Sequence, residues 1–145
     1  MFATIKSLGL FGLNAFPVDV EVDIQKGLPH FDIVGLPDAA VKESRERIRA
    51  ALYSISVTLP PKHIVVNLAP ADVKKSGTMH DLAILVGVLK SMGQLSCSMQ
   101  GKFFIGEVSL SGEVRSVNGV LPMTILARSL GVEELYVPAD NAAEA

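Results

Sequence analysis

The stretch from Ile64 to Lys90 constrains the fold most, because it places a strand, a polar loop and an apolar helix in immediate succession. Its first part, His63 to Leu68, is a largely apolar run rich in β-branched residues, which is typical of a strand buried on both faces. Its last part, Asp81 to Lys90, is apolar on nearly every side and predicts a helix buried in a core. Gly87 in this helix is therefore predicted to be a close-packing contact.

The loop between these two elements, residues 69–78, is the first place to look for a site. Loops held by a rigid scaffold carry function more often than other segments, and this one is expected to lie on the rim above the sheet. Its polar side chains are Asp72, Lys74, Lys75 and Ser76.

The remaining segments predict a chain in which strands and helices interleave. Residues 18–24 alternate between apolar and acidic side chains, which indicates a strand with one face on a core and one face in water. Further strands are predicted over residues 4–10, 30–34, 56–59, 103–110, 113–117 and 134–137. Helices are predicted over residues 39–54, capped by Asp38, and 121–130, closed by Gly131. The predicted fold class is α/β (α+β), with a mixed β sheet and about three helices.

Composition limits the classes of protein to consider. The chain has 145 residues, of which 49% are hydrophobic, so one folded domain is expected. Its net charge of -2 means that any contact with nucleic acid must come from a local patch. Cys97 is the single cysteine, which excludes an internal disulfide and fits a reducing compartment. There is no signal-peptide pattern and no apolar run near the ~18 residues that span a bilayer, so a cytoplasmic protein without a membrane partner is expected.

The carboxyl-terminal residues 139–145 resemble the first turn of a helix, with Asp140 or Asn141 as the capping residue. A helix that begins and stops after one turn is unusual. We therefore expect the chain to be an amino-terminal fragment of a longer protein.

Several kinds of chemistry are not expected within this chain. No segment matches the phosphate-binding pattern G-x-x-x-x-G-K-S/T, so ATP binding through a P-loop is excluded. The histidines His30, His63 and His80 have no metal-ligand spacing, and one cysteine cannot complete a structural zinc site. Neither a metal site nor a cofactor site is expected.

The helix predicted over residues 39–54 carries a stripe of cations. Lys42, Arg45 and Arg49 fall on one helical face, with Glu46 between them. One reading is a solvated face held by ion pairs between residues four apart. The other is a stripe that binds phosphate or contacts a subunit, since clustered arginines are the electrostatic signature of phosphate binding. Lys74 and Lys75 have two interpretations as well. They are either phosphate contacts or solvated loop residues, since most lysines lie on the protein surface.

Five blocks of the sequence resemble the amino-terminal domain of the magnesium-chelatase-like proteins of the ComM (YifB) type: residues 27–49, 66–75, 106–115, 119–122 and 137–141. The resemblance implies a bacterial AAA+ ATPase whose motor domain follows this one, binds ATP and magnesium, and assembles as a homo-oligomeric ring. It links the protein to DNA branch migration during natural transformation. It also implies a Lon-peptidase-domain-like fold, with helices on one side of a mixed sheet, shared with the carboxyl domain of the recombination protein RadA.

Lon-type peptidases use a Ser–Lys dyad, and the resemblance identifies the matching positions here. The serine position falls on Met79 and the lysine position on Leu121. A thioether and an alkyl chain can neither attack a carbonyl nor accept a proton, so peptidase activity is not expected. Ser76 with Lys74 or Lys75 is a displaced alternative that would need its two groups held within hydrogen-bond reach.

The function implied by the resemblance is a non-catalytic accessory domain that helps the ring assemble, contacts DNA, or does both. The candidate phosphate contacts are Lys42, Arg45, Arg49, Lys74, Lys75 and Arg115. One alternative is an accessory domain of a magnesium chelatase-type enzyme, although the sequence has no evident magnesium cage of converging carboxylates. Another is a pure oligomerisation scaffold.

Overall fold

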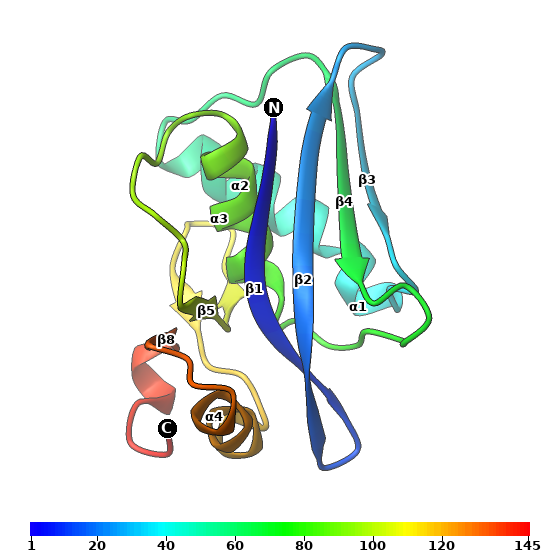
Figure 1. Cartoon of the computed structure of the whole chain (residues 1–145). Helices are drawn as coiled ribbons and strands as arrows, with labels where there is room; N and C mark the ends of the chain where they lie inside the picture. Colours follow the sequence, from blue (N-terminus) through cyan, green and yellow to red (C-terminus); the bar gives the residue numbers. More distant parts are fainter.

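Six strands form one mixed sheet in the computed structural model, which describes residues 1–145 (Figure 1). Their order across the sheet is β3-β4-β2-β1-β5-β8. They are β1 (Phe2–Phe11), β2 (Asn14–Gln25), β3 (His30–Val34), β4 (His63–Ala69), β5 (Lys102–Phe104) and β8 (Glu134–Tyr136). The pairs β1–β2 and β2–β4 are antiparallel, whereas β3–β4, β1–β5 and β5–β8 are parallel. Because β3 pairs only with β4, it leaves one edge of the sheet free.

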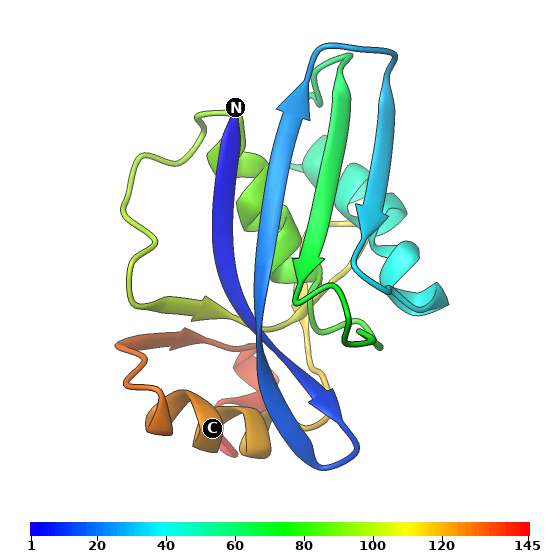
Figure 2. The ribbon, with the colours of Figure 1, turned by 45° about the vertical axis from the view of Figure 1, so that its right-hand side comes forward.

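The helices lie mainly on one face of this sheet. They are α1 (Ala39–Lys42), α2 (Ser44–Ser54), α3 (Asp81–Ser91) and α4 (Val120–Ser129), followed by the 3-10 helix η1 (Ala139–Asn141). Figures 1 and 2 show α1, α2 and α3 together behind the long strands, while α4 lies beside the β1–β2 hairpin. The predicted helix over residues 39–54 is observed with an interruption at Glu43. The predicted fold class is confirmed, and the architecture is compatible with a Lon-like domain.

Apolar and acidic side chains alternate along β2, and the apolar ones face α3, so the main core lies between the sheet and α3. Val20 and Val22 are fully buried, whereas Asp19, Glu21 and Asp23 remain partly exposed on the open face. This confirms the predicted period of two. Burying each such aliphatic side chain stabilises the fold by about 1.5–3 kcal/mol, so the apolar face of β2 determines which side the helices cover.

The strand β4 departs from its prediction in one respect. Ile64, Val66 and Leu68 are buried, but Val65 and Asn67 are only partly buried on the open face. The prediction that both faces are buried is wrong, because helices cover a single face of the sheet. The side-chain amide of Asn67 instead donates to Glu21 Oε1 at 2.7 Å across that open face.

The predicted close-packing role of Gly87 is confirmed. A Cβ atom at this position would lie 2.6 Å from Cγ2 of Val22 and 3.4 Å from Cγ1 of Ile5. The distance to Val22 is far shorter than an ordinary van der Waals contact, so the missing side chain lets α3 lie close against the sheet.

The predicted strand over residues 56–59 is absent. α2 ends in a Schellman motif, in which Val57 N–H donates to Leu52 O at 2.9 Å and Ser56 N–H donates to Tyr53 O at 3.1 Å. Ser56 occupies the left-handed position with φ 63°, where glycine is usual. The chain then folds back, and Pro60 and Pro61 supply no N–H for strand pairing.

The predicted strand over residues 103–110 is divided into two. After β5, Ile105 N–H donates to Tyr136 O and Gly106 N–H donates to Met79 O, so the chain leaves the sheet. It continues into β6 (Glu107–Val108), which pairs with β7 (Val114–Arg115) in a separate two-stranded sheet. Residues 111–112 lie in the turn between these two strands.

The end of the chain also differs from its prediction. Asn141 is not a helix cap, because its side chain accepts from Val117 N–H and donates to Val117 O, both at 3.0 Å. This pairing explains why Asn141 is buried in a 3-10 turn. The predicted closure of α4 is confirmed, since Gly131 has φ 73° and Val132 N–H donates to Ala127 O at 3.1 Å.

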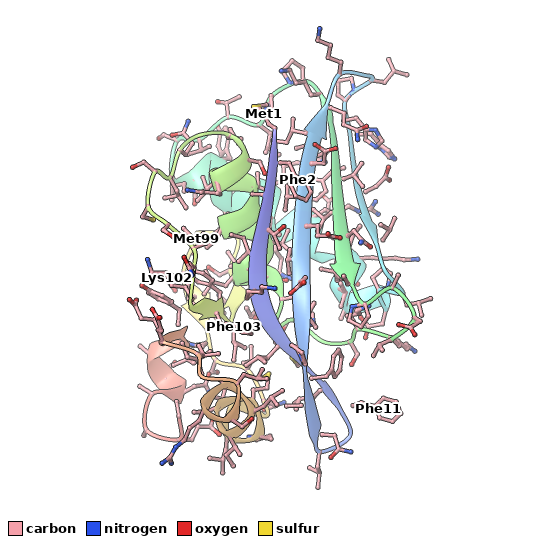
Figure 3. The ribbon with its side chains drawn as sticks, viewed as in Figure 1. Met1, Phe2, Phe11, Met99, Lys102 and Phe103 are labelled. Carbon is pink, nitrogen blue, oxygen red and sulfur yellow. The ribbon has the colours of Figure 1, made fainter.

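The end of the molecule near α4 exposes apolar side chains. Phe11 is 73% exposed and extends away from the β1–β2 hairpin (Figure 3). Leu13 in the hairpin turn and Ile125 on α4 line one shallow hollow and are also exposed. None of the helices has the length and apolar character needed to cross a membrane.

Candidate nucleic-acid interface

The predicted cation stripe lies beside the free edge of β3. α1 contributes Lys42, and α2 contributes Arg45 and Arg49. Arg45 Nη1 donates to Phe31 O at 3.4 Å, so its side chain lies against the outer edge of the strand. Lys42 and Arg45 line a hollow of about 260 Å³ together with Asp32. The structure therefore places the stripe in a groove along the sheet edge.

None of the three stripe cations forms an ion pair. One ion pair between residues four apart does form here, between Glu43 and Arg47 at 3.8 Å. It lies on another side of the helix. The stripe is therefore not a solvated face held by ion pairs between residues four apart, which was one of the two interpretations of the sequence. Lys42, Arg45 and Arg49 remain available to an external anion.

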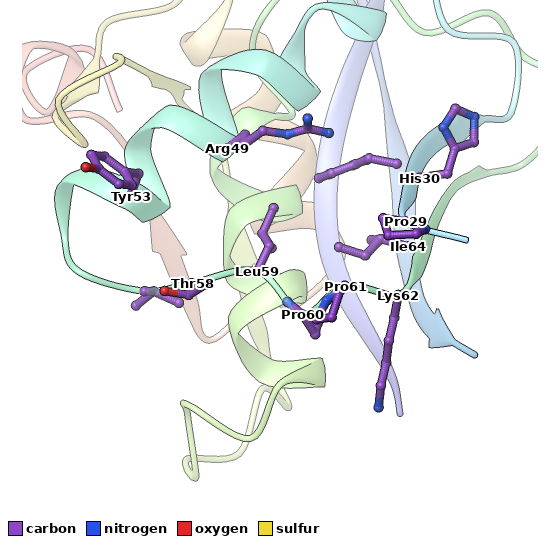
Figure 4. Close-up of a pocket in the computed structure, with 12 residues that line it drawn as sticks. Pro29, His30, Arg49, Tyr53, Thr58, Leu59, Pro60, Pro61, Lys62 and Ile64 are labelled. Atoms are coloured by element: carbon purple, nitrogen blue, oxygen red, sulfur yellow. The ribbon is translucent and has the colours of Figure 1, made fainter. Parts of the chain in front are cut away.

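A larger pocket adjoins the stripe at the end of α2. It has a volume of about 380 Å³ and lies between α2, residues 57–62 and the first residues of β3. Figure 4 shows Arg49 reaching across the pocket toward the His30 side, with Tyr53 at the opposite end and Lys62 pointing away. No carboxylate lines this pocket.

The loop lysines behave differently from each other. Lys74 is exposed, but Lys75 is fully buried, and its Nζ donates to Gly35 O at 2.8 Å and to Pro70 O. Burial lowers the pKa of Lys75. The prediction of Lys75 as a phosphate contact is wrong, because its ammonium group holds two backbone carbonyls inside the protein.

Arg115, the last predicted contact, is exposed on β7 and is not part of the groove. The structure therefore brings together the three helical cations of the predicted set. It does not bring the loop cations Lys74 and Arg115 into the lining of the same groove.

A buried ion-pair network that the sequence reading missed fixes the orientation of the stripe. Asp81 is fully buried, and its Oδ2 accepts from Arg47 Nε at 2.6 Å and from Val108 N–H at 3.1 Å. Its Oδ1 accepts from Ser44 Oγ at 2.5 Å and from Arg47 Nη2 at 3.0 Å. The hydrogen bond with Asp81 raises the pKa of Arg47. The signal available in the sequence was helical spacing, which puts Arg47 on the same face as Ser44 and Ile48.

The positions that match the Lon dyad are apolar and separately placed. Met79 is 8% exposed and packs in the smaller apolar cluster with Leu8 and Met123, whereas Leu121 is 50% exposed on α4. The displaced alternative is not assembled either. Ser76 is exposed, and Lys75 Nζ donates to backbone carbonyls.

Two histidines that are distant in sequence meet on the open face of the sheet. The register of β3 against β4 pairs His30 with His63, and both Nε2 atoms lie next to Asp32, at 2.9 and 2.8 Å. The hydrogen bond with His63 is the main cause of the lowered pKa of Asp32. No group of three or more His, Cys, Asp or Glu side chains is arranged to hold a metal ion.

The mixed sheet with helices mainly on one face makes this a mixed α/β domain, and its architecture is compatible with a Lon-like domain. Comparison with known proteins specifies it further. Residues 20–141 match the family described as subunit ChlI of Mg-chelatase, and the chain belongs to that family. This confirms the resemblance found in the sequence.

Individual relatives agree with the family match. The competence protein ComM of Haemophilus influenzae is 42% identical over 144 residues, which is 99% of this chain and 28% of ComM. The protein YifB of Escherichia coli is 40% identical over 131 residues, 90% of this chain and 26% of YifB. A mitochondrial Lon protease homolog of Drosophila melanogaster is 32% identical over 96 residues, 64% of this chain and 9% of that protein. The chain thus spans about 28% of the length of the curated relative ComM.

Proposed function

We propose that this chain is a non-catalytic accessory domain of a ComM-like, Mg-chelatase-related AAA+ ATPase, and that it contacts DNA through the groove at the β3 edge. In the full-length protein a motor domain would bind ATP and magnesium, and the subunits would form a ring that acts in DNA branch migration during natural transformation. The observation that carries the proposal is the gathering of Lys42, Arg45 and Arg49, without ion pairs, beside the free edge of the sheet.

The charge distribution supports contact at this edge and not elsewhere on the sheet. Glu21 and Asp23 lie on the open face, where they repel phosphate, whereas Asp19 is paired there with Lys6 at 2.7 Å. Opposite charges separated on a small domain confine a polyanion to the cationic side, even though the net charge is -2. With three cations available, binding by the domain alone should be weak, at the ~10⁻⁴–10⁻⁶ M level of non-specific contact.

Charge reversal in the stripe should abolish binding. We expect Arg45→Glu/Arg49→Glu to lose detectable affinity for DNA while the fold is retained, because both side chains lie on the helix surface. Each phosphate contact that is lost should flatten the dependence of log affinity on log salt by about 0.7–0.9. The measurement is fluorescence anisotropy with single-stranded and forked DNA across a salt series.

The matched control is Lys102→Glu/Arg128→Glu, which makes the same change in net charge at positions outside the groove. This control should bind DNA nearly as well as the wild type. Equal affinities for the wild type and the stripe variant would reject the groove as the DNA contact. No binding by any of the three proteins would favour a scaffold role.

The proposal that the domain is non-catalytic has its own test. We expect the purified chain neither to cleave unfolded casein nor to react with a serine-directed probe, because Met79 and Leu121 occupy the dyad positions. Mass spectrometry of the probe-treated chain measures the labelling, with Ser76→Ala as the control. Labelling of the wild type that disappears in Ser76→Ala would show an activated serine and overturn this part of the proposal.

A specific observation also favours a role in ring assembly. Phe11, Leu13 and Ile125 expose apolar surface at the end of the molecule near α4, away from the cationic groove. Exposed apolar patches on folded domains commonly mark contacts with other proteins. We propose that this end contacts another part of the assembly, so that DNA contact and ring assembly use separate surfaces.

A further inference from the structure

We propose that the pocket at the end of α2 receives one base of a single-stranded nucleic acid, with Tyr53 stacking on the base and Arg49 holding the neighbouring phosphate. This inference rests on the proposed DNA contact and deepens it. It adds a structural reason for the domain to distinguish single strands from duplex.

The size and walls of the pocket fit a flat, largely apolar group. Its volume of about 380 Å³ lies within the usual range for small-ligand sites. Phe31 and Ile64 from the sheet and Leu59 from the returning segment supply apolar walls. Nucleic-acid bases bind such surfaces through their faces, because stacking needs no sequence-specific partner.

The electrostatics of the pocket select an anion. Arg49 reaches across it and forms no ion pair, and no aspartate or glutamate lines the walls (Figure 4). A guanidinium group presents several donors in one plane and pairs well with phosphate oxygens. The occupant should therefore combine an apolar ring with an adjacent negative charge, which describes a nucleotide unit.

Tyr53 is the side chain best placed to cover a base. It lies on the last turn of α2 and is 86% exposed. An aromatic ring exposed at the mouth of an apolar, cation-bearing pocket is the arrangement that single-strand binding proteins use to stack bases. The usual loss on replacing such a ring by alanine is roughly 5- to 150-fold in affinity for each base.

The pocket lies next to the hollow that holds the other two stripe cations. Lys42 and Arg45 line the hollow along the β3 edge, and Arg49 lies one helical turn beyond Arg45, in the pocket wall. From Arg45 to Arg49 α2 advances roughly 6 Å, which allows these two cations to follow consecutive phosphates of one strand. Duplex DNA can use the cations, but its bases are stacked inside the helix and cannot enter the pocket.

The composition of the chain provides a direct optical test. It contains two tyrosines and no tryptophan, so Tyr136→Phe leaves Tyr53 as the sole fluorescent reporter. In this variant, an oligothymidine should quench the fluorescence after inner-filter correction. An abasic oligonucleotide of the same length and a duplex should leave the fluorescence unchanged.

Affinity measurements complete the test. Tyr53→Ala should weaken single-strand binding roughly 5- to 150-fold and leave duplex affinity unchanged, whereas Tyr53→Phe should restore single-strand binding. Because Tyr53 is exposed, both variants should keep the far-ultraviolet circular dichroism of the wild type.

The outcomes separate this inference from the proposed function. Equal single-strand affinity of Tyr53→Ala and wild type, with binding still lost in Arg45→Glu/Arg49→Glu, would overturn the base pocket and keep the DNA contact. Equal binding of the abasic and normal oligonucleotides would overturn it in the same way. Absence of any DNA binding by the wild type would overturn both. Occupation of the pocket by an acidic peptide, with no oligonucleotide bound, would assign it to a protein partner instead.

Discussion

Replacing Asp81 by alanine should lower the free energy of unfolding by about 3–5 kcal/mol, the largest effect expected for a single residue in this domain. Asp81 is fully buried and accepts four hydrogen bonds, from Ser44, Arg47 and Val108. Its removal leaves a mostly buried guanidinium group and a buried backbone N–H without partners. Since small domains are stable by about 5–15 kcal/mol, the variant should be close to unfolding.

The measurement is urea denaturation followed by circular dichroism, with the slope of the transition checked against the wild type. The matched control is Arg47→Met/Asp81→Leu, which removes both charges. This double variant should be more stable than Asp81→Ala, because replacing both members of a buried pair by apolar groups avoids an unpaired charge. A loss below about 1 kcal/mol in Asp81→Ala would contradict the assignment of a buried, fully bonded pair.

The Asp81 network also explains how α2 presents its cations. Arg47 points inward to Asp81, so the neighbours Arg45 and Arg49 must point to the other side, along the β3 edge. The same aspartate reaches β6 through Val108 N–H, which ties the two-stranded sheet to α3. One buried carboxylate therefore fixes the relative position of two helices and orients the proposed DNA contact.

Much of the fold could be predicted because local pattern and tertiary environment agree there. The alternation in β2 indicated its buried face, and the apolar sequence around Gly87 indicated close packing. The cation stripe followed from helical spacing alone. In each case the residues concerned lie within one element, so their periodicity carries the information.

The errors arise where partners distant in sequence decide the outcome. Lys75 was expected in solvent because lysine is rarely buried, but the carbonyls of Gly35 and Pro70 lie where its ammonium group can donate to them. Helical spacing places Arg47 on the inward face of α2, but its partner Asp81 lies 34 residues away and cannot be identified from that spacing. The pocket at the end of α2 is closed by the segment that follows the turn at Ser56, which adopts a left-handed conformation usually left to glycine.

A second large effect is expected from pH, through His80. This side chain is fully buried at the start of α3. Ser7 Oγ donates to Phe104 O at 2.8 Å, so the contact of Ser7 with His80 Nδ1 at 3.4 Å assigns the proton to Nδ1. Nε2 is buried without a partner. The neutral imidazole is therefore the form that the folded protein holds.

Burial lowers the pKa of His80 from 6.5 to about 4, and the Lys75 ammonium group adds to this effect while Asp38 opposes it. The unfolded chain binds a proton at this residue as pH falls below 6.5, whereas the folded protein binds it only near 4. His80 therefore does not change the free energy of unfolding above pH 6.5. As the pH falls from 6.5 to about 4, protonation of His80 in the unfolded chain lowers the free energy of unfolding. The loss approaches about 3 kcal/mol, since each unit of pKa difference corresponds to about 1.4 kcal/mol.

Urea denaturation of the wild type and of His80→Gln, at about pH 7 and about pH 4.5, measures this contribution. Glutamine does not titrate, so the stability of the variant should fall less than that of the wild type, by roughly 2–3 kcal/mol. Other groups cancel in this comparison. Asp32, for example, has a lowered pKa and stabilises the fold above pH 3.8, so its contribution is lost only at lower pH and in both proteins. Parallel stability curves for the two proteins would show that His80 has the same pKa in the folded and unfolded chain and would contradict its burial as a neutral side chain.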